Sequence, residues 1–463
     1  MTPKAATFAE LMAAAKPLLK GKAIYSVEEM HALGPLVTMA GTESVLPVTA
    51  EHDPFPSALK TVLDARGKWA DATAATIYTT ESLLAKTNTS VFAVQAPTCM
   101  PFLVDAIIDA KMATFWMQDM CNASSPQHAA MEALVERSGH FDNIKSGGKG
   151  GLYYMGWFNH THEPNPELME ECTLKHSLIT LASDQSDNLS FLNKVGAKTK
   201  SPFVQPPLFS GGQPKLYSPT KAYVSILVSD GDNIAEDWAT LRPMLEERVQ
   251  SMSKVPVGWT ISNRWLQWGP AVLDWAYAQA AKTTTDSFLM GPSGYGYLFP
   301  GNMSASADKD WFAHATVEAA TALGMTGYIH WDVDLFMDNA TTKRTEDYLK
   351  RFEGTAVDGA FMLGSDPLPP EWPVKHPYES PTWVGDVACF KPIYQYGPPN
   401  VTTASAAVNT VPPGSMVYVY IGLGSDMHFV DGLAAAVADH IELVGYRELI
   451  ELAKQKKKLQ DDG

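Results

Sequence analysis

The sequence lacks the features that define several large classes of protein. It contains no run of about 18 uninterrupted apolar residues, so it predicts no transmembrane helix. Lys and Arg number 35 against 51 Asp and Glu, and the resulting net charge of −16 argues against a nucleic-acid partner because phosphate backbones would be repelled. It has no Gly-x-Ser-x-Gly elbow and no dinucleotide-binding glycine fingerprint, which disfavours serine-hydrolase and nicotinamide chemistry.

Cysteine is also scarce, and the four cysteines have spacings that fit no zinc site. In a secreted chain they could form up to two disulfides, whose pairing stays open because four cysteines allow three connectivities. Buried free thiols are the alternative. The four residues are Cys99, Cys121, Cys172 and Cys389.

The N-terminal residues Met1 to Lys20 lack the apolar core of a signal peptide. Seven of the 13 asparagines nevertheless begin an Asn-x-Ser/Thr sequon, where chance gives about two. This excess predicts an extracellular or secretory-pathway protein whose signal peptide is missing from this numbering, and a cytosolic protein with accidental sequons is the alternative. The predicted glycosylation sites are Asn88, Asn122, Asn159, Asn188, Asn302, Asn339 and Asn400.

Short apolar runs alternate with helical patterns in the first third of the chain, which favours a parallel sheet. The predicted strands are Lys22 to Val27, Ala74 to Thr79, Ser90 to Gln95 and Ala113 to Met117. The predicted helices are Ser57 to Ala65, Pro101 to Ala110 and Pro126 to Ser138. We therefore expect a smaller α/β domain over residues 1–145, which ends at a glycine-rich run.

Further strand patterns follow over residues 146–463, and amphipathic helical patterns separate most of them. The eight predicted strands are Leu152 to Trp157, Leu178 to Ser183, Ala222 to Ser229, Val257 to Ser262, Ser287 to Met290, Gly327 to Asp332, Ala360 to Gly364 and Val417 to Gly422. Continuous apolar strands are typical of a sheet buried on both faces. The pattern predicts an α/β fold with a (β/α)8-like barrel, or a seven-stranded or open version of it. The Pro-rich stretches Ser201 to Pro219 and Pro367 to Pro399 are predicted to be insertions.

Polar residues follow almost every predicted barrel strand. Active sites of α/β barrels lie at the C-terminal ends of the strands, so these side chains are expected to converge on one mouth. The alternative for each of them is a helix N-cap, where Asp and Ser are preferred. In the sharpest cluster, Asp230 and Asp232 flank a glycine and are followed by Asn233. The two carboxylates could hold a divalent cation, or one could act as general acid or nucleophile while Asn233 binds a sugar hydroxyl.

Cleavage of a glycosidic bond requires two carboxyl groups, which lie ~5–5.5 Å apart in retaining and ~6.5–9.5 Å apart in inverting enzymes. The candidate pairs are Asp232 with Asp332, Asp232 with Glu163, and Asp332 with Asp366. The sequence gives no distances, so the stereochemical outcome stays open.

The run Gly291 to Pro300 combines three glycines with aromatic residues after a predicted strand. Glycine lets a ligand approach the main chain, and aromatic rings offer flat apolar faces that suit a sugar ring. The alternative is a stiff loop whose rings cap the core. His160 and His162 lie two residues apart in another predicted loop and could ligate zinc. No third ligand lies at a characteristic spacing, so we expect polar contacts or a solvated loop there.

Three segments together resemble the GxGYxYP family of putative glycoside hydrolases, and the likeness extends roughly from Ala93 to Asp366. The segments are Val228 to Asn233, Gly258 to Ser262 and Gly291 to Pro300. One departure is Phe299, which stands where the family has its second signature tyrosine and so lacks a hydroxyl. The resemblance implies a carbohydrate-active protein.

These observations predict an extracellular glycoside hydrolase in which Asp232 and Asp332 form the catalytic pair. The predicted substrate-binding residues are Asp230, Asn233, Trp259, Arg264, Tyr295, Tyr297, His160 and Asp184. The first alternative is a non-catalytic glycan-binding or extracellular matrix protein on the same fold. A weaker alternative is a metal-dependent, deacetylase-like hydrolase with a divalent cation at Asp230 and Asp232.

Overall fold

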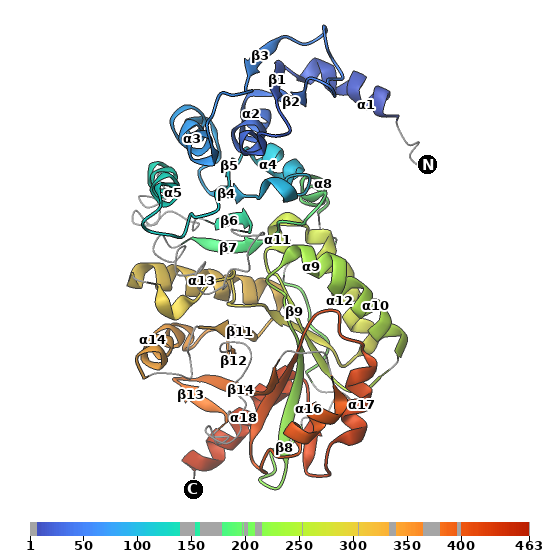
Figure 1. Ribbon diagram of the computed structural model, residues 1–463. Coiled ribbons are helices and arrows are strands. Elements are labelled where there is room, and N and C mark those ends of the chain that lie inside the picture. The colour runs from blue at the N-terminus through green and yellow to red at the C-terminus, as the bar shows by residue number, and fades with distance from the viewer. Residues whose placement is uncertain are drawn as a thin grey trace. The chain divides into compact units, whose positions relative to one another are not determined.

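The computed structural model describes residues 7–138, 153–157, 178–196, 198, 202–208, 215–251, 253–303, 305–332, 339–363, 380–395 and 400–462. The chain divides into two compact units, Met1–Ser190 and Phe191–Gly463. Figure 1 shows their elements in colours that run from blue to red along the chain. The boundary predicted at residues 145/146 lies outside the described residues.

The N-terminal unit contains two parallel sheets. In the first, the order is β2-β1-β3, formed by β1 (Gly21–Tyr25), β2 (Val45–Thr49) and β3 (Thr61–Asp64). In the second, the order is β5-β4-β6-β7, formed by β4 (Val91–Val94), β5 (Ala113–Phe115), β6 (Tyr153–Gly156) and β7 (Ile179–Ala182). The accompanying helices are α1 (Phe8–Ala15), α2 (Leu33–Glu43), α3 (Ala72–Tyr78), α4 (Val104–Ala110), α5 (Pro126–Arg137) and α8 (Leu189–Leu192).

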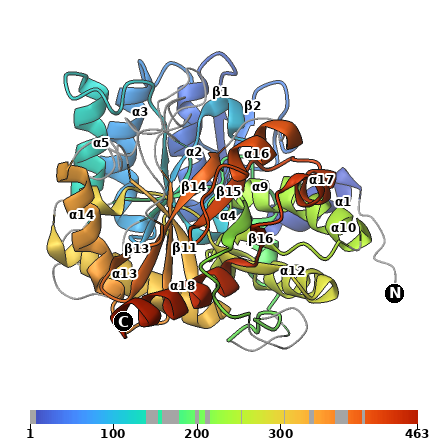
Figure 2. The same ribbon diagram turned by 90° about the horizontal axis from the view of Figure 1, so that it is seen from below.

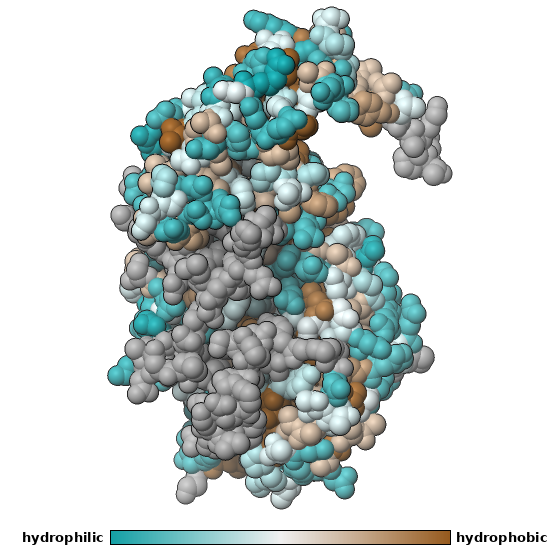
Figure 3. Space-filling view, in the orientation of Figure 1, coloured by the Kyte–Doolittle hydropathy of each residue, from teal (hydrophilic) through white to brown (hydrophobic). Residues whose placement is uncertain are grey.

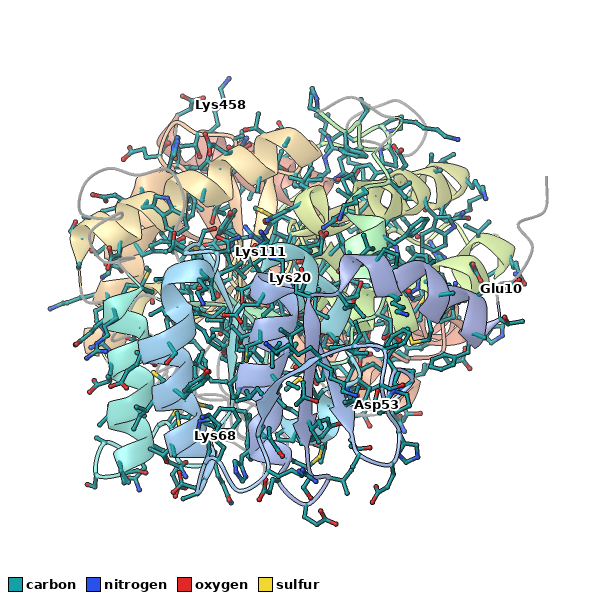
Figure 4. The ribbon with its side chains drawn as sticks, turned by 90° about the horizontal axis from the view of Figure 1, so that it is seen from above. Glu10, Lys20, Asp53, Lys68, Lys111 and Lys458 are labelled. Carbon is teal, nitrogen blue, oxygen red and sulfur yellow. The ribbon has the colours of Figure 1, made fainter. Side chains whose placement is uncertain are left out.

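Local capping explains two of these elements. Thr7 and Glu10 form a capping box at the start of α1, and Figure 4 labels Glu10 in this first turn. Asp71 accepts a hydrogen bond from the amide of Ala74 (2.8 Å) and starts α3. The predicted strand Ala74 to Thr79 is therefore wrong, because this cap outweighs the strand preference of its β-branched residues.

Two further predictions for this part of the chain are corrected. The predicted helix Ser57 to Ala65 contains strand β3. The predicted first two barrel strands are β6 and β7, and β6 pairs in parallel with β4 rather than with a barrel strand. Sequence alone could not place them, because a buried parallel strand has the same apolar pattern in either sheet.

The C-terminal unit is a closed barrel of seven parallel strands. They are β8 (Ala222–Val228), β9 (Val257–Ile261), β10 (Ser287–Met290), β11 (Gly327–Trp331), β12 (Gly359–Leu363), β14 (Val387–Gln395) and β15 (Met416–Ile421). Each pairs with the next, and the pairing of β15 with β8 closes the ring. The predicted seven-stranded version of the barrel is thus confirmed. Strand β13 (Thr382–Val384) runs antiparallel to β14, and β16 (Ile441–Leu443) adds to β8.

Helices surround this barrel, as Figure 2 shows. They are α9 (Ile234–Glu236), α10 (Arg242–Ser251), α11 (Trp265–Trp268), α12 (Pro270–Thr283), α13 (Ser306–Leu323), α14 (Asn339–Leu349), α16 (Val401–Val408), α17 (His428–Ala436) and α18 (Tyr446–Asp461). A π-helical turn, η6 (Asp237–Leu241), joins α9 to α10.

No described helix is both long and apolar enough to cross a membrane. Hydrophilic residues cover most of the described surface visible in Figure 3.

Helix α18 packs against the N-terminal ends of the barrel strands. A Cβ added at Gly258 or Gly327 would lie 3.4 or 3.2 Å from the ring of Tyr446, and the Tyr446 hydroxyl donates to the carbonyl of Phe288 (2.7 Å). Because α18 covers this end, the opposite C-terminal ends of the strands are left to form a site.

Both states expected for cysteine, disulfide-bonded and free, occur among the described cysteines. Cys121 is disulfide-bonded, whereas Cys99 and Cys389 are free thiols. Cys389 is buried in β14. Cys172 lies outside the described residues.

Candidate active site at the barrel mouth

The loop after β8 is fixed by close backbone contacts with its neighbours. A Cβ at Gly231 would lie 2.1 Å from the carbonyl carbon of Thr260, and one at Gly291 would lie 2.4 Å from that of Gly231. The amide of Gly231 also donates to the Thr260 hydroxyl (2.9 Å). Glycine is therefore required at both positions, and the ends of β8, β9 and β10 are locked together.

Two acidic residues lie on this loop, and each is partly exposed as a whole residue. Asp230 has a left-handed backbone (φ 64°), accepts a hydrogen bond from the Ser229 hydroxyl, and is approached by the amide of Leu423. Burial raises the pKa of Asp230, and these donors oppose the rise by favouring its ionised form.

Asp232 has the more strongly perturbed carboxyl group. Loss of hydration among surrounding protein atoms raises its pKa well above the usual range, and the negative charges of Asp230 and Asp237 raise it further. Two neighbouring acids in different environments are the usual basis for separate acid and base roles. Among the described residues, this pair belongs to no group of three ligands close enough to share a metal ion.

Asp237, in the π-helical turn η6, is a third carboxyl group that the sequence did not single out. It is 3% exposed, and its Oδ2 accepts from the amide of Ser262 (2.9 Å) and the indole of Trp265 (2.8 Å). Its Oδ1 is buried with no hydrogen-bond partner in the described structure. Burial raises its pKa to about 8, and the charges of Asp230 and Glu236 contribute. Nothing in the sequence distinguishes this residue, since an acidic residue near the start of a helix is common.

Asn233 caps the helix that follows this loop. Its Oδ1 accepts from the amides of Ala235 (3.0 Å) and Glu236 (3.3 Å), which is the N-cap arrangement. The oxygen predicted to bind a sugar hydroxyl is therefore engaged by backbone donors.

Asp332, at the end of β11, has a different environment from Asp232. It is 0% exposed. Its Oδ2 accepts from Thr345 (2.5 Å) and lies 2.7 Å from His330 Nε2, while its Oδ1 accepts from the amide of Gly301 (3.1 Å). The Tyr328 hydroxyl lies 2.8 Å from His330 Nδ1. This network joins β11 to α14 and to the turn after the signature run, and it leaves Asp332 no exposed surface.

The signature run Gly291–Pro300 is mostly packed inward. Tyr297 and Phe299 are buried, and their rings meet Trp331 edge-on with centroids 4.7 and 5.1 Å apart. Tyr295 is partly exposed, and the Arg264 guanidinium lies over its ring at 4.4 Å. Tyr295 is thus the less enclosed of the two tyrosines, whereas Tyr297 mainly packs the loop.

Trp259 lies in the core. It is 0% exposed, and its indole donates to Asp286 (3.0 Å), the residue just before β10. Asp286 also pairs with buried Arg248 (2.8 Å) at that end of the barrel. The prediction that Trp259 shapes a sugar site finds no support in this placement.

Asp184 and His160 are the remaining residues that were predicted to bind substrate. Asp184 follows β7 in the N-terminal unit and is 6% exposed. His160 lies outside the described residues, as do His162, Glu163 and Asp366.

The structure so far defines a seven-stranded parallel α/β barrel with acidic side chains at the C-terminal ends of its strands. Residues 220–368 match the family model described as the GxGYxYP putative glycoside hydrolase C-terminal domain. This match confirms the resemblance predicted from the sequence for that part of the chain, which contains β8 to β12.

Comparison with solved structures supports the fold of almost the whole chain. The chain is similar to the crystal structure of a putative hydrolase from Bacteroides thetaiotaomicron VPI-5482, with a TM-score of 0.74 and 19% identity. The similarity covers 96% of this chain and 83% of that one. Comparison with curated proteins gives no match.

Proposed function

We propose that this protein is a glycoside hydrolase whose chemistry is carried out by Asp230 and Asp232. The observation that carries the proposal is a pair of partly exposed aspartates on one tightly packed loop at the barrel mouth, both with carboxyl pKa values raised by burial. The match of this region to a glycoside hydrolase family supports carbohydrate as the substrate class.

The two carboxyl groups take different roles in this proposal. Asp232, which has the more strongly raised pKa, gives its proton to the glycosidic oxygen as the bond from that oxygen to the anomeric carbon breaks. Asp230 is helped to ionise by Ser229 and the Leu423 amide, and it acts on the anomeric carbon directly or through a water. The distance between the carboxyl oxygens of Asp230 and Asp232 when substrate is bound decides between retention and inversion.

Asp332 supports the site in this proposal and is not the second catalytic group. Its carboxylate is fully buried and already bound by His330, Thr345 and Gly301. A carboxylate that must reach an anomeric carbon needs an open face, which favours Asp230 as the partner of Asp232.

An extracellular location remains part of the proposal. The sequon residues Asn122, Asn188 and Asn400 are exposed, as glycosylation requires. The disulfide at Cys121 also favours an oxidising compartment.

The function is tested by incubating the full chain with a panel of polysaccharides and measuring newly formed reducing ends. The proposal expects activity on at least one member, and loss of that activity in the Asp230→Asn, Asp232→Asn double variant. Activity that persists in the folded double variant would overturn the assignment of these residues.

A glycan-binding protein without catalysis is the second candidate. It is favoured by the absence of a hydroxyl at Phe299, where the family signature has a tyrosine. Binding to an oligosaccharide array without any release of reducing ends would support it over hydrolysis.

A further inference from the structure

A second group of ligand-type side chains lies apart from the Asp230–Asp232 pair. Glu247, on α10, and Asp426 and His428, at the start of α17, each offer one ligand atom, and these three atoms lie within 4.8 Å of one another. The two segments are far apart in the sequence, so the fold brings the group together.

These three side chains are free to bind. Asp426 and His428 are exposed and Glu247 is partly exposed. Asp426 accepts a hydrogen bond from the amide of His428 (2.8 Å), which orients its carboxylate toward the start of α17. The two carboxylates lie close together with the His428 imidazole beside them, and none of the three side chains forms an ion pair within the described part of the chain.

We propose that Glu247, Asp426 and His428 form a binding site for a divalent transition-metal ion of the zinc type. A cation would relieve the repulsion between the two carboxylates. One imidazole and two carboxylates form a mixed nitrogen and oxygen ligand set that suits zinc better than calcium or magnesium, which prefer oxygen ligands alone. The remaining coordination positions would be filled by water.

The observed spacing is close to what such an ion needs. Ligand atoms about 2.0–2.2 Å from a tetrahedral zinc ion lie roughly 3.4 Å from one another. The ligand atoms here lie within 4.8 Å of one another, so their separations need to shorten by at most about 1.4 Å. Exposed side chains can achieve this by changing rotamers.

The site has a consequence for the barrel mouth. The ion would connect α10 to the loop between β15 and α17. These two segments already touch, because the amide of Gly424 in the loop donates to the sulfur of Met244 on α10 (3.1 Å). The same loop carries Leu423, whose amide donates to the Ser229 hydroxyl (3.2 Å) and approaches the Asp230 carboxylate. Metal binding would thus hold in place a donor that favours the ionised form of Asp230.

Calorimetric titration of the full, chelator-treated chain with ZnCl2, MgCl2 or CaCl2 tests this site without requiring any substrate. We expect one zinc ion to bind and to raise the thermal midpoint, with magnesium and calcium having no effect. Asp426→Asn keeps the acceptor for the His428 amide, and both it and His428→Gln should weaken zinc binding at least roughly tenfold.

A matched control is available on α13. His314 is also exposed and lies 3.3 Å from Glu318, but it has no third ligand in the described structure. His314→Gln should bind zinc as the unmodified protein does. The proposal is overturned if the unmodified protein binds no zinc, or if Asp426→Asn and His428→Gln bind it unchanged.

Discussion

The ends of strands β8 and β11 both carry aspartates, yet the two environments are opposite. At β8, Asp230 and Asp232 are partly exposed, and burial together with mutual repulsion raises the pKa of Asp232. At β11, Asp332 is fully buried among hydrogen-bond partners. A position at the mouth of a barrel therefore does not define a catalytic carboxylate. The supply of donors and the open face do, and this comparison leads to four predictions.

The largest expected effect is on catalysis at β8. Asp232→Asn should reduce turnover of a confirmed glycoside substrate roughly 10²–10⁴-fold, because it removes the proposed general acid. The thermal midpoint should change little, since the Asn amide is neutral and close in size to the protonated carboxyl group that it replaces. Activity close to that of the unmodified protein would show that the acid lies elsewhere.

The matched substitution at β11 should affect stability instead. Asp332→Asn removes an acceptor shared by His330, Thr345 and Gly301 inside the protein, and should destabilise the barrel unit by about 3 kcal/mol or more. Thermal unfolding measures the effect. An unchanged midpoint together with lost turnover would reverse our comparison and make Asp332 the catalytic group.

Asp237 predicts a pH dependence of stability. Its folded-state pKa of about 8 lies above that of the unfolded chain, roughly 3.9, so the folded protein holds this proton more tightly. The resulting stabilisation is complete below about pH 4 and is lost as the pH rises toward 8, by roughly 1.4 kcal/mol per pH unit.

The variant Asp237→Asn isolates this contribution because it cannot ionise. Relative to the unmodified protein, its thermal midpoint should improve steadily between pH 5 and pH 8. A difference between the two proteins that does not change with pH would contradict the raised pKa of Asp237.

The smallest effect is expected at Phe299. Its ring is 0% exposed and packs edge-on against Trp331. Phe299→Tyr, which introduces the family residue, should lower stability by about 1–3 kcal/mol because the added hydroxyl is buried. A rise in the thermal midpoint would mean that the surroundings hold a ready hydrogen-bond partner for that hydroxyl.

Local patterns predicted much of the barrel. The strand predicted over Ser287–Met290 has the same bounds in the structure, and those predicted for β8, β9, β11, β12 and β15 differ by single residues. Strand β14 was missed because it lies in a stretch predicted to be an insertion and contains Pro392, a residue that is unusual inside a sheet.

The site was less accessible to sequence analysis. The position of Asp230 and Asp232 after an apolar strand was enough to single them out. Asp332 is hydrogen-bonded to Thr345 and Gly301, and Trp259 is hydrogen-bonded to Asp286. All of these partners come from other parts of the chain. Asp237 becomes notable only when the fold places it beside the other two carboxylates.

The account rests on a protonated Asp232 beside an ionised Asp230. Titration of 13C-labelled aspartate carboxyls by NMR, with Asp232 assigned through the Asp232→Asn spectrum, measures this protonation state directly. We predict a midpoint for Asp232 well above the ordinary value of roughly 3.9. A midpoint at or below that value would contradict the proposed acid.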